Sequence, residues 1–408
     1  MNLSIDHLPA SCDVLVVGAG PAGSAAAIQL ARGGLDVVLV DQHAFPRDKV
    51  CGDALIPDAH VALKKLGMLR AVMTKAKMVS HVGCVAPRGG RVEVPGELAV
   101  LPRKLLDDLL CRAAVLSGAR MVAPARFVET VESGGRVVGA RLRGSGSVQD
   151  IRARWVVLAT GAVPQATLAA GMCERQLPSG VALRGYVRNT QVAKELRVLD
   201  IVWHRALRPG YGWVFPCGGD LYNIGVGVSH SHKELAGGRA SKKGDANLRE
   251  IFDTFTRIYA PARALMDGGE MLGDLKGAPL RCTLEGARLA KPGLLVTGEA
   301  AGSTYSFTGE GIGKALETGM MAAEALLSGG EDAMVMGDYE AAVARLKPRF
   351  ALYERANFVN EHPWLADLLI WRARNNPRLL QRMSGVLNET SNPGNLVSAK
   401  GLMRLITG

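Results

Sequence analysis

The chain has 408 residues, of which 48% are hydrophobic, and its 49 Lys and Arg outnumber 38 Asp and Glu to give a formal net charge of +11. This length allows two or three domains, and the composition is typical of a soluble protein. The sequence contains no apolar run long enough to span a membrane. It also contains no recognisable nucleic-acid-binding module and no basic run interleaved with aromatic residues, so we expect no nucleic-acid partner.

Seven scattered cysteines form no C-x-x-C pair, which argues for reduced thiols, against a disulfide framework and against a metal site. The first residues, MNLSIDHLPASCD, carry no basic region or apolar core of a secretion signal, so we expect a cytoplasmic protein. The positive charge suits an anionic membrane surface at which the protein is peripheral, an acidic carrier protein, or the phosphates of a substrate and cofactor. A generally basic solvated surface explains the charge equally well.

The segment from residue 13 to residue 41 has every part of a dinucleotide site. An apolar run over 14–17 predicts a buried parallel strand, and Gly18, Gly20 and Gly23 follow as G-x-G-x-x-G at the start of an alanine-rich helix. The glycines permit a tight turn, close approach of a pyrophosphate and close helix packing, while the helix N-terminus offers free N–H groups. A second strand over 37–40 ends at Asp41, where a carboxylate would bind both hydroxyls of a ribose.

The remaining elements follow a mixed pattern. Residues 103–117 predict an amphipathic helix with Leu105, Leu106, Leu109 and Leu110 on its apolar side. Further along, the patterns predict a hairpin over 127–131 and 137–142, a buried strand over 155–158, mostly antiparallel strands within 171–275, a parallel strand over 294–297, a helix over 311–327, and helices after 332.

Three further motifs accompany the glycine-rich turn. They are FPRDKVCGDALIPDA (45–59), GYGWVFP (210–216) followed by YNIGVGV (222–228), and GEAAGSTYSFTGEGI (298–312). With the first motif, they resemble the FAD-dependent geranylgeranyl reductase family, within the group of flavoproteins shaped like p-hydroxybenzoate hydroxylase. Three positions depart from the family pattern: Glu299 replaces an Asp, Ser306 a common Pro, and Cys217 a frequent Lys.

The resemblance implies an α/β fold, in which a Rossmann-like FAD-binding domain is interleaved with an antiparallel-sheet substrate domain and followed by C-terminal helices. We assign 1–75, 101–170 and 276–330 to the FAD-binding domain, 76–100 and 171–275 to the substrate domain, and 331–408 to the helical region. The implied cofactor residues are Gly18, Gly20, Ala22, Gly23, Asp41, Arg47, Cys51, Gly52, Arg103, Gly161, Glu299, Gly309, Gly311 and Ile312.

The resemblance also suggests where chemistry takes place. Cys51 would lie near the flavin ring, where its thiol could donate a proton to a carbon, although it could equally be a pocket-lining residue. Tyr211, Trp213 and Phe215 alternate on a predicted strand and therefore share one face. We name Cys51, Tyr211 and Trp213 as catalytic candidates. The substrate candidates are Tyr211, Trp213, Phe215, Ser306 and Phe307.

Two activities fit these residues. The first is reduction of a carbon–carbon double bond in a polyprenyl or other lipophilic substrate, with NAD(P)H as a transient electron donor or with another donor. The alternative is a monooxygenase that hydroxylates an aromatic or carrier-bound substrate; a halogenase fits less well because its W-x-W-x-I-P motif is not matched here. A non-enzymatic flavin-binding protein is disfavoured by the intact ring-contact motifs. The C-terminal helices carry Arg372, Arg374, Arg378 and Arg382 near Trp364 and Trp371, which suggests contact with a membrane.

Overall fold

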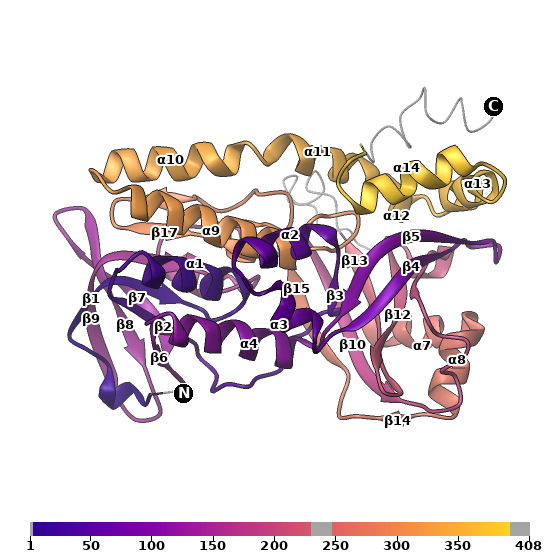
Figure 1. The fold of residues 1–408 in the computed structure, drawn as a ribbon, viewed down its shortest axis with the longest axis horizontal. Helices are drawn as coiled ribbons and strands as arrows, with labels where there is room; N and C mark the ends of the chain where they lie inside the picture. The colour runs from indigo at the N-terminus through magenta and orange to yellow at the C-terminus, as the bar shows by residue number, and fades with distance from the viewer. Residues whose placement is uncertain (1–2, 230–246, 392–408) are drawn as a thin grey trace.

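The computed structural model describes residues 3–229 and 247–391, and its elements are arranged around two β-sheets (Figure 1). The first sheet has the order β16-β17-β9-β1-β2-β6, with β8 paired to β9 and β7 paired to β8. Its strands are β1 (Ser11–Val17), β2 (Val37–Val40), β6 (Arg120–Val122), β7 (Arg126–Ser133), β8 (Arg136–Arg143), β9 (Val148–Leu158), β16 (Ala290–Lys291) and β17 (Leu294–Val296). The central strands β17, β9, β1, β2 and β6 are parallel, as the expected Rossmann-like fold requires.

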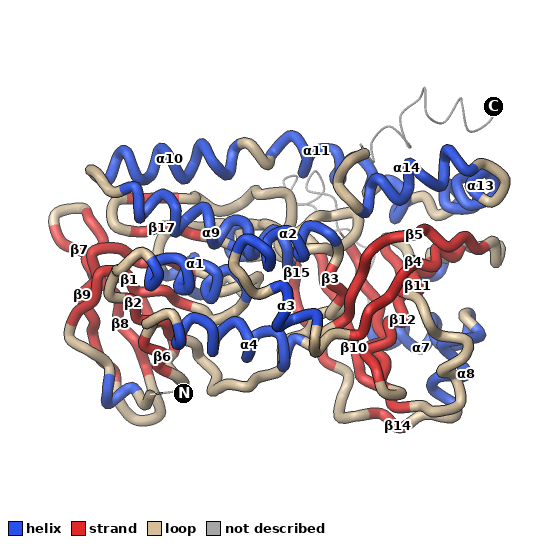
Figure 2. Tube along the Cα trace, viewed as in Figure 1, coloured by secondary structure: helices blue, strands red, loops and turns tan. Residues whose placement is uncertain are grey.

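Helices cover the parallel sheet on one face (Figure 2). They are α1 (Pro21–Arg32), α4 (Arg103–Leu116) and α9 (Ile312–Ser328). Alternate residues of β1 enter different cores: Val14 and Val16 pack with these helices, whereas Leu15 and Val17 pack on the side of β7 and β8. In α4, Leu106 and Leu110 are buried as expected, but Leu105 is 49% exposed, so its placement on the apolar side was wrong.

The second sheet has the order β14-β10-β13-β12-β11-β4-β5-β3, with β15 also paired to β10. Its strands are β3 (Ala54–Leu55), β4 (Lys77–Val85), β5 (Arg91–Val100), β10 (Gly180–Arg188), β11 (Leu199–Val202), β12 (Gly210–Gly218), β13 (Leu221–Ser229), β14 (Glu270–Met271) and β15 (Lys276–Leu280). Every pair is antiparallel except β11 with β4. The sheet thus includes β3 and β15, which lie within segments that we assigned to the FAD-binding domain.

The second sheet is covered on both faces. Helices α7 (Leu248–Ile258) and α8 (Ala260–Asp267) pack on one face through a core that includes Phe252 and Phe255. The opposite face packs against the C-terminal helices through a core that includes Trp213, Phe215 and Leu365. Shorter elements complete the described chain: η1 (Ile5–His7), α2 (Pro57–Lys65), α3 (Leu69–Met73), α5 (Gln165–Ala169), η2 (Arg205–Leu207) and η3 (Gly298–Ala301).

The C-terminal region is helical, as expected, as far as Leu387. It contains α10 (Asp332–Ala344), α11 (Lys347–Ala356), α12 (Phe358–Glu361), α13 (Trp364–Ala373) and α14 (Pro377–Leu387), which run along one side of the molecule in Figure 1. The end of the assigned helical region, 392–408, lies outside the described residues. Within the described chain, no helix combines the length and apolarity needed to cross a bilayer.

Candidate functional site

The predicted dinucleotide motif lies at the carboxyl ends of the parallel strands, where ligands bind in folds of this kind. Gly18 follows β1 with φ of 102°, and a Cβ built there would lie 2.4 Å from the carbonyl oxygen of Ala159. A Cβ at Gly23 would lie 1.8 Å from the carbonyl oxygen of Gly18, so both glycines are required by backbone contacts. Gly20 differs, because a Cβ there would meet no atom closer than 3.7 Å.

Two arginines face the open side of Gly20. The guanidinium groups of Arg47 and Arg103 are both 3.7 Å from the Cβ position of Gly20. Asp107 is fully buried and holds both of them, at 2.9 Å from Arg47 and 2.7 Å from Arg103. Helix α1 begins at this turn, and no side chain caps it. Two guanidinium groups beside free helix N–H groups suit the pyrophosphate of FAD.

Other predicted cofactor residues lie close to this turn. Asp41 directly follows β2, and its carboxylate accepts hydrogen bonds from the N–H groups of Ala19 and His43, both at 3.0 Å. Arg47 also pairs with Asp41 at 3.3 Å, so a ribose would share this carboxylate with protein donors. Ala22 packs with Ala159 and Ala315, and Gly161, at φ of 76°, would present a Cβ to open space.

The late glycine-rich segment forms a tight loop between β17 and α9. Gly309 has φ of 69°, Gly311 precedes the first residue of α9, Ile312, and no side chain caps that helix. The Glu299 carboxylate accepts hydrogen bonds from the Thr304 hydroxyl at 3.2 Å and from the Arg281 N–H at 3.4 Å. The carboxylate of Glu299, whose side chain is one methylene longer than that of Asp, is therefore held by protein donors.

An aromatic row on the second sheet meets this loop. Tyr211, Trp213 and Phe215 succeed one another along β12 with 6.3 Å between adjacent ring centroids. The Tyr211 hydroxyl donates a hydrogen bond to the carbonyl oxygen of Thr308 in the loop. Phe307 reaches the row through Trp203, which lies 6.5 Å from Phe307 and 6.2 Å from Tyr211. The Ser306 hydroxyl is buried without a hydrogen-bond partner in the structure.

Glycines on the neighbouring strand β13 make room for Trp213. A Cβ at Gly225 would lie 2.3 Å from Cζ2 of Trp213, and one at Gly227 would lie 3.6 Å from its Cζ3. The indole therefore lies flat over β13. The YNIGVGV motif and the aromatic motif beside it thus describe a single packing unit.

Gly52, which directly follows Cys51, lies against this row. A Cβ at Gly52 would be 3.1 Å from the Phe215 ring and 3.6 Å from the Trp213 indole nitrogen. Burial raises the pKa of the Cys51 thiol, whereas the nearby Arg103 guanidinium opposes that shift. The thiol is therefore protonated at neutral pH. The N–H of Asp53 points at its sulfur at 3.3 Å, so a donor stands ready for a thiolate.

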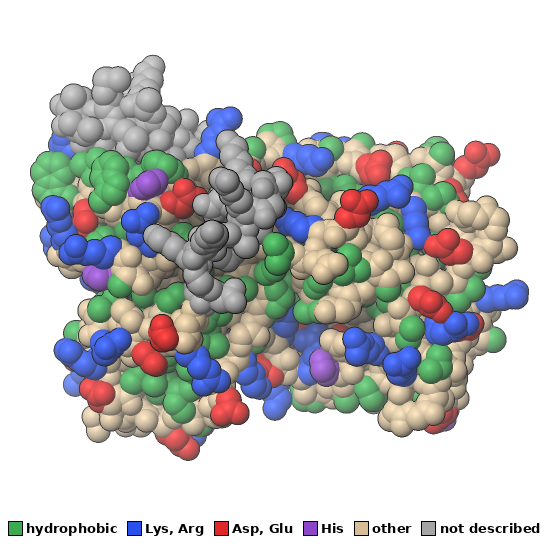
Figure 3. Space-filling view, turned by 180° about the vertical axis from the view of Figure 1, so that it is seen from behind, with side chains coloured by type: hydrophobic (Ala, Val, Ile, Leu, Met, Phe, Trp, Pro, Cys, Tyr) green, Lys and Arg blue, Asp and Glu red, His purple; other side chains and the backbone are tan. Residues whose placement is uncertain are grey.

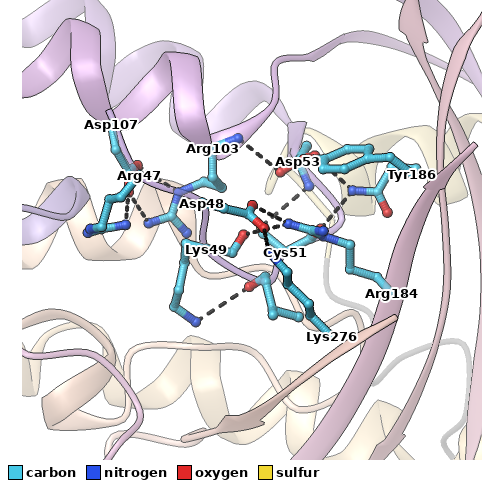
Figure 4. A network of polar contacts seen from close by, with 12 residues as sticks. Arg47, Asp48, Lys49, Cys51, Asp53, Arg103, Asp107, Arg184, Tyr186 and Lys276 are labelled. Carbon is cyan, nitrogen blue, oxygen red and sulfur yellow. Dashed lines mark hydrogen bonds and ion pairs between the residues drawn. The ribbon is translucent and has the colours of Figure 1, made fainter. Parts of the chain in front are cut away.

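A polar network anchors the segment that carries Cys51 (Figure 4). Asp48 pairs with the buried Arg184 of β10 and with Lys276 of β15 at 2.9 Å. Arg184 also lies over the Tyr186 ring at 4.2 Å, and Tyr186 donates to Asp53 at 2.5 Å. These contacts join the segment to the second sheet.

A second buried cluster lies behind the late loop. Lys314 contacts Glu317 at 2.7 Å, Glu389 at 3.1 Å and Asp58 at 3.8 Å. Burial raises the pKa of Asp58 to about 7 and that of Glu310 to about 8. Both carboxyls therefore hold their protons more tightly than usual, close to the loop that includes Gly309 and Gly311.

All seven cysteines are free thiols. Cys217 is partly buried, and burial raises the pKa of its thiol. Among the residues that the structure describes, no group of three or more His, Cys, Asp or Glu side chains could hold a metal ion.

The sequence did not single out several residues of the site. Asp53 and Asn223 lie within the quoted motifs but were not named as site residues. Arg184 and Tyr186 were missed because they come from a distant strand and carry no local pattern. Asp107 alone had a usable signal, since it is four residues from Arg103 in a predicted helix and can therefore pair with it.

Comparison with known proteins agrees with this geometry. Residues 11–189 match the FAD binding domain family. A menaquinone reductase of Mycolicibacterium smegmatis is 36% identical over 336 residues, covering 78% of this chain and 77% of that protein. Digeranylgeranylglycerophospholipid reductase 2 of Methanopyrus kandleri is 30% identical over 314 residues, covering 76% of each chain. A geranylgeranyl bacteriochlorophyll reductase-like protein of Thermoplasma acidophilum has the same fold, with a TM-score of 0.71 and 22% identity over 97% of this chain and 96% of that one.

The fold and the glycine-rich cradle define a flavin-dependent oxidoreductase that binds FAD. Two relatives at 30% identity or more are matched over three quarters of their length. The chain belongs to the FAD-dependent geranylgeranyl reductase family.

Proposed function

We propose that this protein reduces a carbon–carbon double bond of a polyprenyl or other lipophilic substrate. The observation that carries the proposal is a protonated, partly buried thiol on a segment that packs against a row of aromatic side chains. Two relatives are named for menaquinone and for a digeranylgeranyl lipid, and both compounds carry polyprenyl chains. An apolar wall with few polar groups suits such a chain.

The candidate cofactor residues divide into two groups. The turn at Gly20, with Arg47 and Arg103, would hold the pyrophosphate, and Asp41 would meet the ribose. The loop at Gly309 and the N-terminus of α9 at Gly311 and Ile312 would meet the flavin ring, with Glu299 and Gly161 nearer the middle of the cofactor. When bound, FAD supplies hydride for the substrate carbon.

The protein must supply the proton for the neighbouring carbon. Cys51 is suited to this step because its thiol is neutral at physiological pH. The thiolate left behind would be stabilised by the Asp53 N–H, 3.3 Å from the sulfur, and by the positive charge of Arg103. Tyr211, Trp213 and Phe215 would orient the substrate and exclude water, with Phe307 and Ser306 at the loop side of the row.

The electron donor is NAD(P)H in this proposal, docking transiently before the substrate. A test is anaerobic mixing of the FAD-loaded protein with NADPH or NADH while flavin absorbance is followed. Bleaching of the flavin supports a pyridine nucleotide donor. A flavin that stays oxidised with both nucleotides points to a ferredoxin-like donor.

Product mass separates reduction from the monooxygenase alternative. The reduced protein is offered menaquinone, a geranylgeranyl lipid or an aromatic acid, with and without air. Products are analysed by mass spectrometry after any quinol has been reoxidised to the quinone. A gain of two mass units without oxygen supports the reductase. A gain of sixteen units that requires oxygen would establish a hydroxylase and overturn the proposal.

The C-terminal helices offer a membrane-facing surface in this proposal. Trp364 and Trp371 are 59% and 58% exposed, Phe358 is 43% exposed, and Arg372 lies over the Trp371 ring at 4.8 Å. Viewed from behind, hydrophobic side chains gather at the end of the molecule where α13 lies, with Lys and Arg nearby (Figure 3). Exposed tryptophans beside arginines suit the interface of an anionic bilayer.

Vesicle binding tests this surface. The protein is spun with vesicles containing phosphatidylserine at low salt and compared with W364S/W371S. We expect the wild type to sediment with the vesicles and the variant to lose most of this binding. Equal sedimentation of both proteins, or no sedimentation of the wild type, would rule out membrane binding through Trp364 and Trp371.

A further inference from the structure

Asp53 is a fully buried carboxylate in an unusual backbone conformation. Its side chain is 0% exposed, and its φ of 67° lies in the left-handed region that favours glycine. An aspartate in this position is strained, so the surrounding contacts must hold it there. Strain of this kind two residues from the candidate acid Cys51 calls for a role at the site.

Four groups hold Asp53. Its Oδ1 accepts a hydrogen bond from the Arg103 N–H at 3.1 Å, and its Oδ2 accepts from the Tyr186 hydroxyl at 2.5 Å and from the Asn223 amide at 2.7 Å. Its carbonyl oxygen accepts from the Leu101 N–H at 3.1 Å. This conformation directs the Asp53 N–H toward the Cys51 sulfur.

Asn223 connects the same unit to the aromatic row. Its Nδ2 donates to the Cys51 carbonyl oxygen at 2.7 Å as well as to Asp53, and its Oδ1 accepts from the Trp213 indole N–H at 2.9 Å. Asn223 is 0% exposed, so no water competes for these bonds. One amide thus fixes the thiol segment, the carboxylate and the indole relative to one another.

We propose that Asp53 and Asn223 are a positioning pair that holds the segment of Cys51 against the aromatic row and keeps the Cys51 sulfur in the protonated form. The inference rests on the proposed role of Cys51 as the acid. A negative charge next to the thiol opposes loss of its proton, and the Asn223 bonds keep the thiol and Trp213 at a constant separation. The pair acts through Cys51 and need not contact the substrate.

Other charged and titratable groups face this unit. Arg103 from α4 and Lys49 from the same segment lower the pKa of Cys51, while burial and Asp53 raise it. Arg184 from β10 faces Asp53, and Cys217 from β12 faces it as well. Burial raises the pKa of Asp53 to about 6, so its carboxylate is mostly ionised at pH 8.

The test measures the reactivity of Cys51 rather than turnover. FAD-loaded protein is treated with iodoacetamide from pH 6 to pH 10, and alkylation of the Cys51 peptide is quantified by mass spectrometry. Asp53→Asn removes the charge and keeps the shape. We expect the thiol pKa to fall by about one unit, which raises the alkylation rate at pH 8 about tenfold.

One control variant completes the design. Asp200→Asn is the matched control. Asp200 lies in the same sheet, is 1% exposed, and likewise accepts a hydrogen bond from a tyrosine hydroxyl, in this case Tyr259 at 2.6 Å. Asp200→Asn should leave the Cys51 profile unchanged.

The proposal is overturned if Asp53→Asn reacts like the wild type, or if Asp200→Asn shifts the profile equally. If Asp53→Asn does not fold, Asn223→Ala replaces it, and unchanged alkylation in that variant overturns the proposal. If bound flavin shields the sulfur, the series is repeated on flavin-stripped protein whose fold is checked by circular dichroism. Because no substrate is used, failure here is distinct from failure of the reductase proposal, which the product mass decides.

Discussion

Replacement of Gly225 by alanine tests how the aromatic row is held. The new Cβ would lie 2.3 Å from Cζ2 of Trp213 and 2.5 Å from the carbonyl oxygen of Leu183, so the indole must move. Overpacking of this kind costs about 1–3 kcal/mol. Movement of Trp213 would also break its 2.9 Å bond to Asn223 and leave buried polar groups unpaired, at a further cost of about 1–3 kcal/mol.

Gly227→Ala is the control, since its Cβ would lie at an ordinary 3.6 Å from the same indole. That variant should change stability by less than about 1 kcal/mol, and a small gain is expected from the lower entropy of the unfolded chain. Urea unfolding of both variants gives the stability comparison, and kcat/KM for reduction of the unsaturated substrate gives the comparison of activity. We expect Gly225→Ala to be less stable by about 2–6 kcal/mol and to lose turnover. Similar stability for both variants would refute the packing argument.

Three further predictions concern the cofactor and the acids. Gly20→Ala should leave the melting temperature unchanged but weaken FAD binding about tenfold or more in a fluorescence titration. Gly23→Ala should lower the melting temperature, because only the Cβ at position 23 would collide with backbone atoms. Equal effects of the two variants on both measurements would contradict this prediction. Burial raises the pKa of Glu310 to about 8 from 4.5, so its stabilising contribution is complete below pH 4.5 and is lost as the pH rises toward 8. Glu310→Gln should therefore flatten the fall in unfolding free energy between pH 5 and pH 8, as measured by urea titration, and a slope equal to that of wild type would refute the assignment. Cys51→Ser should lower kcat about 100-fold with FAD affinity retained, because a hydroxyl is a far weaker acid than a thiol; wild-type turnover would exclude Cys51 as the proton donor.

Much of the fold could be predicted because its signals are local. The run of apolar residues before Gly18 and the glycines after it depend on contacts within about ten residues, and β1, β2 and α1 lie where the sequence predicted them. The alternation of Tyr211, Trp213 and Phe215 on β12 follows in the same way from the period of a strand.

The partners of these residues could not be predicted. Asp53 meets Tyr186 and Asn223 only because strands β10 and β13 pair in register, and a one-residue shift would turn both side chains to the other face. The raised pKa values of Asp58 and Glu310 come mainly from burial. That burial depends on how segments distant in the sequence pack together. Leu105 was misplaced because helical periodicity identifies an apolar stripe but not its edge.

A single-turnover experiment tests the central claim most directly. The FAD-loaded protein is reduced photochemically without oxygen, mixed with one equivalent of a geranylgeranyl lipid, and followed by stopped-flow absorbance with quenched samples for mass spectrometry. We predict that flavin oxidation and a product two mass units heavier than the substrate appear together, with one product molecule formed for each flavin oxidised. Flavin that remains reduced until air is admitted would contradict it.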